Sequence, residues 1–208
     1  DGIYFFTNNK GRLCEFVLSS GRDLSFSTND EDWANNMKVK GNKEEDVYFK
    51  YIQASNAYTK QFKQLSKDKN TLTKEEYNKR LVDIRAGADS VKNSFIKDHP
   101  EDLLTKILKC SKPIDIPEFP TKYKQDGSVD SLKMQMDRFV YYKQHYFDNV
   151  DFSCSGLIRT PKPVFFNNYK GYWDNVMKYE SNDSIFYYAN IIIDRAKKSN
   201  IMYKYIID

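Results

Sequence analysis

Residues 141–161, YYKQHYFDNVDFSCSGLIRTP, hold more side chains capable of chemistry than any comparable stretch of this chain. His145 and Cys154, together with an aspartate, are the ingredients of a cysteine hydrolase, but a nucleophile also needs an oriented base within hydrogen-bond reach and donors for the oxyanion. Asp148 and Asp151 are of the type that binds calcium, but DNVD lacks the glycine and the distal glutamate of an EF-hand loop. Residue types alone therefore do not predict an active site here.

A structural role explains the same residues more simply. If residues 129–147 form a helix, Tyr142, His145 and Tyr146 lie three or four positions apart and can share a face. Such a face could bind a haem or a small ligand, but a lone histidine at the end of a helix more often caps it near the negative pole of the helix dipole. We therefore interpret the stretch as the corner of a helical fold.

The residues that follow this helix are typical of a turn. Asp148 and Asp151 can accept hydrogen bonds from backbone amides just ahead of them. Arg159 opens the RTP run that leads into the next helix and can pair with either aspartate, although a partly exposed ion pair contributes only about 0–1 kcal/mol. We predict no catalytic, cofactor-binding or metal-binding residues in this chain. The predicted structural or contact cluster consists of Tyr142, His145, Tyr146, Asp148, Asp151 and Arg159.

The composition is that of a globular protein with a ring-rich core. The 208 residues are 40% hydrophobic and 15% aromatic. Lys and Arg number 33 against 29 Asp and Glu, and the two signs are interspersed, so the net charge of +4 does not form the basic stripe of a nucleic-acid-binding protein. No apolar run approaches the ~18–20 residues of a membrane span. The chain begins at Asp1 without an initiator methionine, so we expect an excised fragment whose targeting segment has been removed.

The three cysteines, Cys14, Cys110 and Cys154, are far apart in the sequence and form no C-x-x-C motif. This spacing argues against a redox dithiol or a zinc site within the chain. Buried thiols are the simplest interpretation, because an unpaired cysteine behaves as a small hydrophobic residue. A Cys110–Cys154 disulfide is the alternative.

Residues 1–41 show the two-residue period and the turn signals of short β-strands. We predict an antiparallel β-meander that is the C-terminal part of a truncated β-domain, and its apolar face needs a cover of helices or further strands. The expected strands lie at 3–6, 13–18 and 24–28, with a fourth candidate at 36–41 and tight turns at 8–11 and 20–23.

Residues 42–208 are predicted to form a helical domain. Apolar residues at alternating steps of four and three over 44–66 and 74–97 indicate an antiparallel αα-hairpin with a coiled-coil-like seam. Thr73 and Glu76 form a capping box that starts the second helix, and Pro100 ends it.

Further helices follow the hairpin, separated by a stiff proline-rich segment after Cys110. The apolar stripe of the 129–147 helix contains Leu132, Met136, Phe139 and Tyr146. The fold class is thus α+β, mainly α, with a short meander followed by a bundle of about six or seven helices. The helices expected beyond the hairpin are 101–110, 129–147, 164–179, 183–197 and 200–206.

Several of these segments resemble a known family. HYFDNVDFS followed by LIRTP, with FIKDHPEDLLTKILK and PEFP upstream, resembles an uncharacterised helical domain of Bacteroides-type cell-envelope proteins. In those proteins the domain lies between an N-terminal β-domain and a C-terminal thioredoxin-like domain of the thiol–disulfide oxidoreductase kind. GIYFF and NMKVKGNKEED also resemble the last strands of that β-domain and the start of the first helix, so the resemblance covers nearly the whole chain.

The resemblance implies a non-catalytic accessory region of an exported thiol–disulfide oxidoreductase, located in the periplasm or cell envelope. Its implied partner is a protein, either its own thioredoxin-like domain or a client. The C-x-x-C of that domain is absent from these residues, and the position of Cys154 is more often acidic in the family, so no dithiol chemistry is assigned to this chain. A ligand- or peptide-binding helical module with an aromatic-lined pocket is the alternative function.

Overall fold

The structure is a computed structural model that describes residues 1–7, 13–18, 23–29, 32–41, 43–161 and 163–208. Its fold is α+β and mainly α, as predicted. The chain divides into two compact units, the first formed by Asp1–Leu108 with Arg159–Pro161 and the second by Lys109–Ile158 with Lys162–Asp208. The predicted division between residues 41 and 42 marks the change from strands to helices, and as a domain boundary it stays a prediction.

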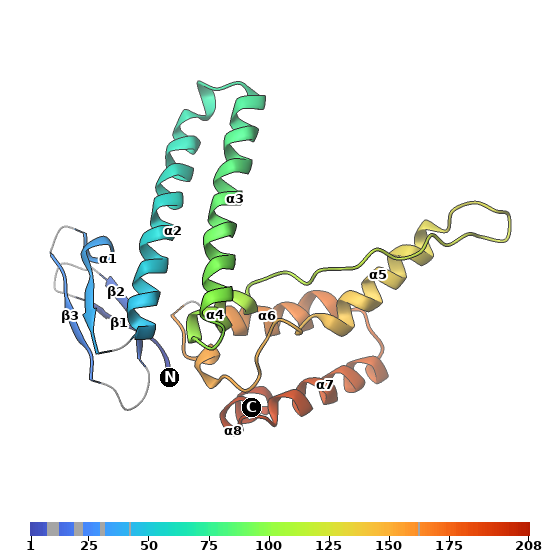
Figure 1. The fold of residues 1–208 in the computed structure, drawn as a ribbon. Helices are drawn as coiled ribbons and strands as arrows, with labels where there is room; N and C mark the ends of the chain where they lie inside the picture. Colours follow the sequence, from blue (N-terminus) through green and yellow to red (C-terminus); the bar gives the residue numbers. More distant parts are fainter. Residues whose placement is uncertain (8–12, 19–22, 30–31, 42, 162) are drawn as a thin grey trace. The chain divides into compact units, whose positions relative to one another are not determined.

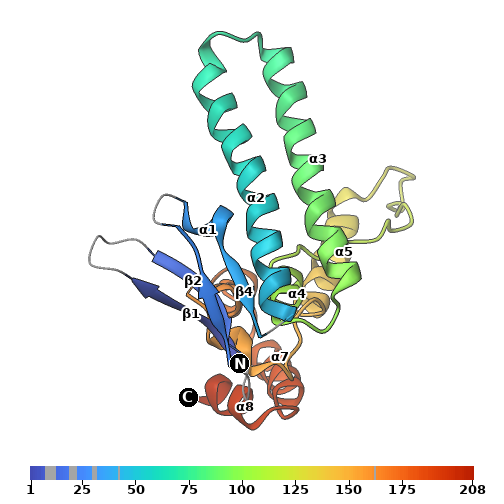
Figure 2. The same cartoon turned by 60° about the vertical axis from the view of Figure 1, so that its left-hand side comes forward.

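The four expected strands are present in the first unit, as two antiparallel pairs (Figures 1 and 2). Strands β1 (Gly2–Thr7) and β2 (Leu13–Leu18) form one sheet, and β3 (Ser25–Ser27) and β4 (Lys38–Lys40) form the other. The pairing therefore differs from that of a single meander, because β3 pairs with β4 rather than with β2. The predicted turn at 8–11, and all but the last residue of the predicted turn at 20–23, lie outside the described residues.

Aromatic side chains join the two sheets to a covering helix. Phe16 of β2 contacts Phe26 of β3 with ring centroids 5.3 Å apart, and Phe26 contacts Phe49 of helix α2 (Lys43–Lys67) at 6.4 Å. These ring contacts link the two sheets, which the structure describes as separate two-stranded pairs. A four-residue helix, α1 (Trp33–Asn36), precedes β4 and is capped by Asp32. Thus helix α2 supplies the cover that the strands need.

The predicted αα-hairpin is confirmed. Helices α2 and α3 (Lys74–Asp98) run side by side in opposite directions, joined by a 3-10 turn, η1 (Asp68–Asn70) (Figures 1 and 2). The Thr73–Glu76 capping box is present in full, and His99 is the C-cap residue of α3. No residue of α3 is fully buried, and the residues at alternating steps of four and three are all half-buried: Tyr77, Leu81, Ile84, Ala88, Val91 and Phe95. The hairpin is therefore held by one shared seam.

Two contacts define this seam. The rings of Tyr51 and Phe95 meet edge to face with centroids 5.2 Å apart. Two helical turns along, Gly87 lies so close to the ring of Tyr58 that a Cβ atom at that position would overlap it. A glycine in a helix interior normally costs stability relative to alanine, and here it permits the close approach of the two helices.

Helix α4 (Leu103–Cys110) begins against the base of the hairpin. The backbone amide of Leu103 donates a 2.6 Å hydrogen bond to Glu44 Oε1, so a side chain of α2 satisfies one unpaired donor at the start of α4. The division between the two units falls within this helix, after Leu108.

The second unit holds the remaining helices close to their predicted positions. They are α5 (Ser131–His145), the 3-10 helix η2 (Ser155–Ile158), α6 (Val164–Gly171), α7 (Asn182–Ala196) and α8 (Asn200–Ile207). One difference occurs after α6, where the expected helix 164–179 widens into a π-helical turn, η3 (Tyr172–Val176), and then ends. No helix in the described part of the chain is long and apolar enough to cross a membrane.

The core of the second unit is ring-rich, as the composition predicted. Phe147 contacts both Phe152 and Tyr172, with centroid separations of 5.8 and 4.9 Å. Phe165 continues the cluster from Phe152, and it is completely buried. Offset and edge-on ring pairs of this kind are worth about 0.5–1.5 kcal/mol each beyond the area they bury.

Candidate functional site

The corner predicted from residues 141–161 follows the end of α5 in the second unit. His145 Nδ1 donates to Asp148 Oδ2 at 2.5 Å, and Arg195 of α7 donates to Asp148 Oδ1 at 3.1 Å. The ring of Tyr141 stacks on His145 with centroids 4.0 Å apart. Asp148 therefore connects the end of α5 to α7, and both of its carboxylate oxygens have partners.

The other polar residues of the corner bond to nearby chain. Asp151 Oδ1 accepts hydrogen bonds from the backbone amide and the hydroxyl of Ser153, at 2.9 and 2.5 Å. Asn149 donates to the backbone carbonyls of Lys112 and Pro113, at 3.0 and 3.2 Å. These contacts are those of a turn tied to the start of the proline-rich segment.

Tyr142 and Tyr146 contact each other edge to face at 5.4 Å and border a cavity of about 190 Å³. Cys110 lies in its wall, and burial raises the pKa of this thiol to about 11. The side-chain amide of Asn168 donates to the backbone carbonyl of Cys110. Since the thiol stays protonated at neutral pH, Cys110 offers little thiolate to this cavity. The remaining lining residues are Ser111, Lys112, Pro113 and Ile114.

Arg159 is the one predicted cluster residue that belongs to the first unit. Its backbone carbonyl accepts a 2.8 Å hydrogen bond from the amide of Ile3 in β1. The predicted pairing of its guanidinium with Asp148 or Asp151 stays a prediction. None of the three cysteines, all of which are described, forms a disulfide.

A buried ion pair lies on α5 that sequence reasoning did not select. Lys143 is only 8% exposed, and its Nζ lies 2.8 Å from Glu180 Oε1. The ammonium also lies 5.8 Å from the ring centre of Phe139 and 5.2 Å from that of Tyr188 on α7. The hydrogen bond from Lys143 holds the pKa of Glu180 below its usual range. The ion pair joins α5 to the segment just before α7, and the contact of Lys143 with Tyr188 reaches α7 itself.

The apolar stripe of α5 continues beyond this pair and is uncovered. Four side chains at helical spacing are between 41% and 68% exposed: Leu132, Met136, Phe139 and Val140. An amphipathic helix in a folded domain normally buries its apolar face. Leu132, Met136 and Phe139 belong to the stripe predicted from the sequence, and all three are exposed instead of packed in a core. A contiguous exposed apolar face of this kind is typical of a protein-interaction surface.

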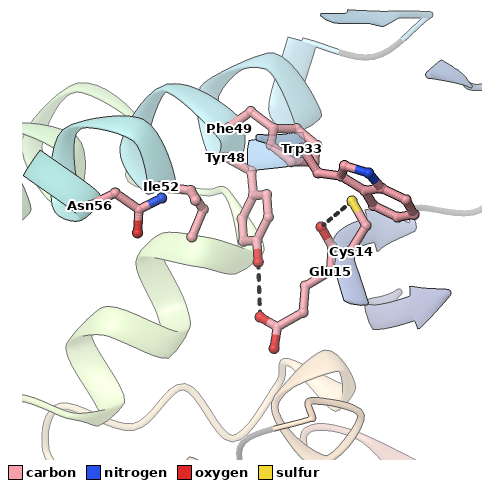
Figure 3. Close-up of a pocket in the computed structure, with 7 residues that line it drawn as sticks. All are labelled: Cys14, Glu15, Trp33, Tyr48, Phe49, Ile52 and Asn56. Carbon is pink, nitrogen blue, oxygen red and sulfur yellow. Dashed lines mark hydrogen bonds between the residues drawn. The ribbon is translucent and has the colours of Figure 1, made fainter. Parts of the chain in front are cut away.

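A second cavity, of about 220 Å³, lies in the first unit between β2, α1 and α2 (Figure 3). Tyr48 projects from α2 with its hydroxyl 3.4 Å from Glu15 Oε2 of β2, while the thiol of Cys14 is directed to the backbone carbonyl of Glu15, 3.7 Å away (Figure 3). The rest of the wall consists of Trp33, Phe49, Ile52 and Asn56.

The carboxylates beside this cavity raise the pKa values of two side chains in its wall. Burial, then the charges of Glu45 and Glu15, raise the pKa of Cys14 to about 11. Burial and the same two carboxylates raise the pKa of Tyr48 as well. Glu45 itself is completely buried, and burial raises its pKa to about 8. Its Oε2 accepts from the amide of Val17, and its Oε1 has no hydrogen-bond partner among the described residues.

Sequence reasoning missed this cavity. It placed Tyr48 in the apolar stripe of α2 and Cys14 among the buried thiols, and it gave Trp33 no role. The available signal was the acidic residue Glu15 inside an otherwise apolar strand, LCEFVL. That signal does not reveal which helix packs against the strand.

Comparisons of the chain with protein-family models, with curated proteins and with solved structures found no match.

Proposed function

We propose that this chain is a non-catalytic accessory region of an exported thiol–disulfide oxidoreductase of the cell envelope or periplasm. In this role it holds the thioredoxin-like domain away from the membrane or presents it to client proteins. The proposal starts from the resemblance of HYFDNVDFS, LIRTP and PEFP to the helical region of such proteins.

The observation that carries the proposal is the uncovered apolar face of α5. Met136 lies at the centre of this face and is 55% exposed, and Leu132 and Phe139 flank it at helical spacing. Burial of apolar surface contributes about 25 cal/mol per Å², so a partner that covers this face gains stability from it. The occupant in this proposal is the thioredoxin-like domain of the same polypeptide.

A supporting role also agrees with the polar groups of the corner. His145 and Arg195 both bond to Asp148, so each is committed to holding α5 and α7 together. A general base or a nucleophile needs a free position toward a substrate and a pKa near the working pH. The Cys110 thiol, with its pKa raised to about 11, does not meet the second requirement.

The test begins with the coding sequence on both sides of this segment. A downstream thioredoxin-like domain with C-x-x-C is expected, and a reading frame that stops near Ile207 contradicts the proposal. With that domain in hand, its binding to this chain is measured by titration calorimetry. Met136→Glu should weaken binding at least tenfold, whereas Arg138→Gln, the same one-unit change in charge at an exposed position on another side of α5, should leave it unchanged.

A second candidate function is a ligand-binding module with an aromatic-lined pocket. The specific observation that favours it is the cavity of Figure 3, whose wall combines three aromatic side chains with a carboxylate and an amide. Pockets that pair apolar rings with a few placed polar groups are typical of small-molecule sites.

A further inference from the structure

We propose that the cavity between β2, α1 and α2 binds a small organic ammonium ion. This inference rests on the second candidate function and is independent of the first. It specifies the chemical class of the ligand and the residues that recognise it.

The rings of the wall are suited to a cation. Trp33, Tyr48 and Phe49 border one space, and Tyr48 and Phe49 meet edge to face with centroids 5.5 Å apart (Figure 3). The face of an aromatic ring carries negative charge density and attracts an ammonium group, most strongly where water is excluded. Tyr48 and Phe49 are only 3% and 4% exposed, so their rings lie in a region with little water.

The charges of the wall favour the same ligand. Glu15 contributes a carboxylate, and the seven described residues that line the cavity include no Lys or Arg. Glu45 lies nearby, but burial raises its pKa to about 8, so it adds a second negative charge only at higher pH. The Glu15 carboxylate is thus the negative charge of the wall that a bound cation would neutralise.

The volume of the cavity and the side chains available in its wall limit the kind of cation further. The cavity of about 220 Å³ equals the volume of roughly seven water molecules, at ~30 Å³ each. This volume holds a headgroup such as trimethylammonium and is smaller than most drug-sized pockets. A calcium or magnesium ion prefers six or more oxygen ligands, and a wall made mostly of rings does not provide them. The geometry therefore favours an organic cation over a metal ion.

The test is a titration of the 208-residue chain with choline. Trp33 and Trp173 are its two tryptophans, so Trp173→Phe leaves the Trp33 indole as the sole fluorescent reporter. Choline should change its fluorescence saturably. Dimethylbutanol, the uncharged carbon isostere of choline, should bind at least tenfold more weakly. Glu15→Gln should weaken choline binding about tenfold and leave dimethylbutanol unaffected.

Asp89→Asn, which removes the same charge from an exposed position on α3, is the matched control and should bind choline as the parent chain does. Equal affinity for choline and dimethylbutanol overturns the ammonium inference but leaves the second candidate function standing. The absence of any saturable change overturns both, and the accessory function is unaffected. The comparison of the two ligands on the parent chain decides the question even if Glu15→Gln fails to fold.

Discussion

The backbone amide of Val17 donates a 2.7 Å hydrogen bond to Oε2 of Glu45, and both residues are completely buried. The bond joins the outer edge of strand β2 to the first turn of helix α2. An unpaired strand edge normally needs a cover, and here one carboxyl group supplies part of it. Because that group is ionisable, the junction between sheet and helix depends on pH.

The first prediction concerns this dependence. Burial raises the pKa of Glu45 to about 8, whereas an unfolded chain has the ordinary value of about 4.3. The folded chain therefore binds a proton that the unfolded chain releases, and the free energy of unfolding should fall as the pH rises between these two values.

Glu45→Gln stays neutral and keeps an acceptor for Val17, so urea unfolding across this range should show a flatter pH profile. Glu75→Gln, an exposed change, serves as the control. Parallel profiles for the parent chain and Glu45→Gln would contradict the assignment.

The second prediction concerns the start of helix α3. The hydroxyl of Thr73 accepts from the amide of Glu76, and the Glu76 carboxylate accepts from the amide of Thr73 at 3.0 Å. Thr73→Ala should lower the free energy of unfolding by about 1 kcal/mol, as is usual for the loss of an N-cap oxygen. Thr73→Ser retains the oxygen and should cost much less. Equal losses for the two variants, measured by urea titration, would show that the methyl group matters rather than the cap.

The third prediction separates the two partners of the buried ion pair. Glu180→Gln leaves the Lys143 ammonium buried without its counter-charge, so we expect a loss of up to about 3 kcal/mol. Lys143→Met removes the charge and keeps a flexible apolar chain between Phe139 and Tyr188, so its cost should be smaller. Thermal unfolding of both single variants and of the double variant measures the difference. A Lys143→Met variant less stable than Glu180→Gln would be inconsistent with this account.

The fourth prediction concerns thiol reactivity. Cys14 and Cys110 are buried, and their pKa values are raised to about 11, so little thiolate is present at neutral pH. Iodoacetamide should leave both unmodified in the native chain, as read by mass spectrometry of the peptides. All three cysteines should react in urea, which controls for reagent and digestion. Rapid native modification of Cys110 would reopen a thiol role in the second unit.

Local sequence signals predicted the elements that depend on neighbours in the chain. The Thr73–Glu76 capping box involves residues only three positions apart, and the repeats of α2 and α3 involve residues three or four positions apart. Sequence spacing alone therefore predicts these elements. The π-helical turn at Tyr172 was missed because its i to i+5 bonding leaves no compositional signal. The strand pairing was also missed, since β3 could have paired with either β2 or β4.

Contacts between distant residues explain the rest. The partner of Asp148 is Arg195, 47 positions away, and no local pattern distinguishes it from Arg159. The cavity beside Tyr48 combines a strand with two helices, so its acidic residue could not be connected with its rings. The exposure of Met136 shows a further limit. A periodic apolar stripe indicates a helix, but it does not reveal whether other residues of this chain or another molecule cover the stripe.

The wide turn at η3 has a consequence for how this chain aligns with others. The amide of Met177 bonds to the carbonyl of Tyr172 at 2.9 Å, so the helix uses one more residue in this turn than an α-helix would. The extra residue brings Tyr172 and Met177 to the same buried side, each only 1% exposed. A homologue with a regular helix here would need one residue fewer to bury the same pair. Its alignment with this chain should therefore show a single-position gap between these two residues.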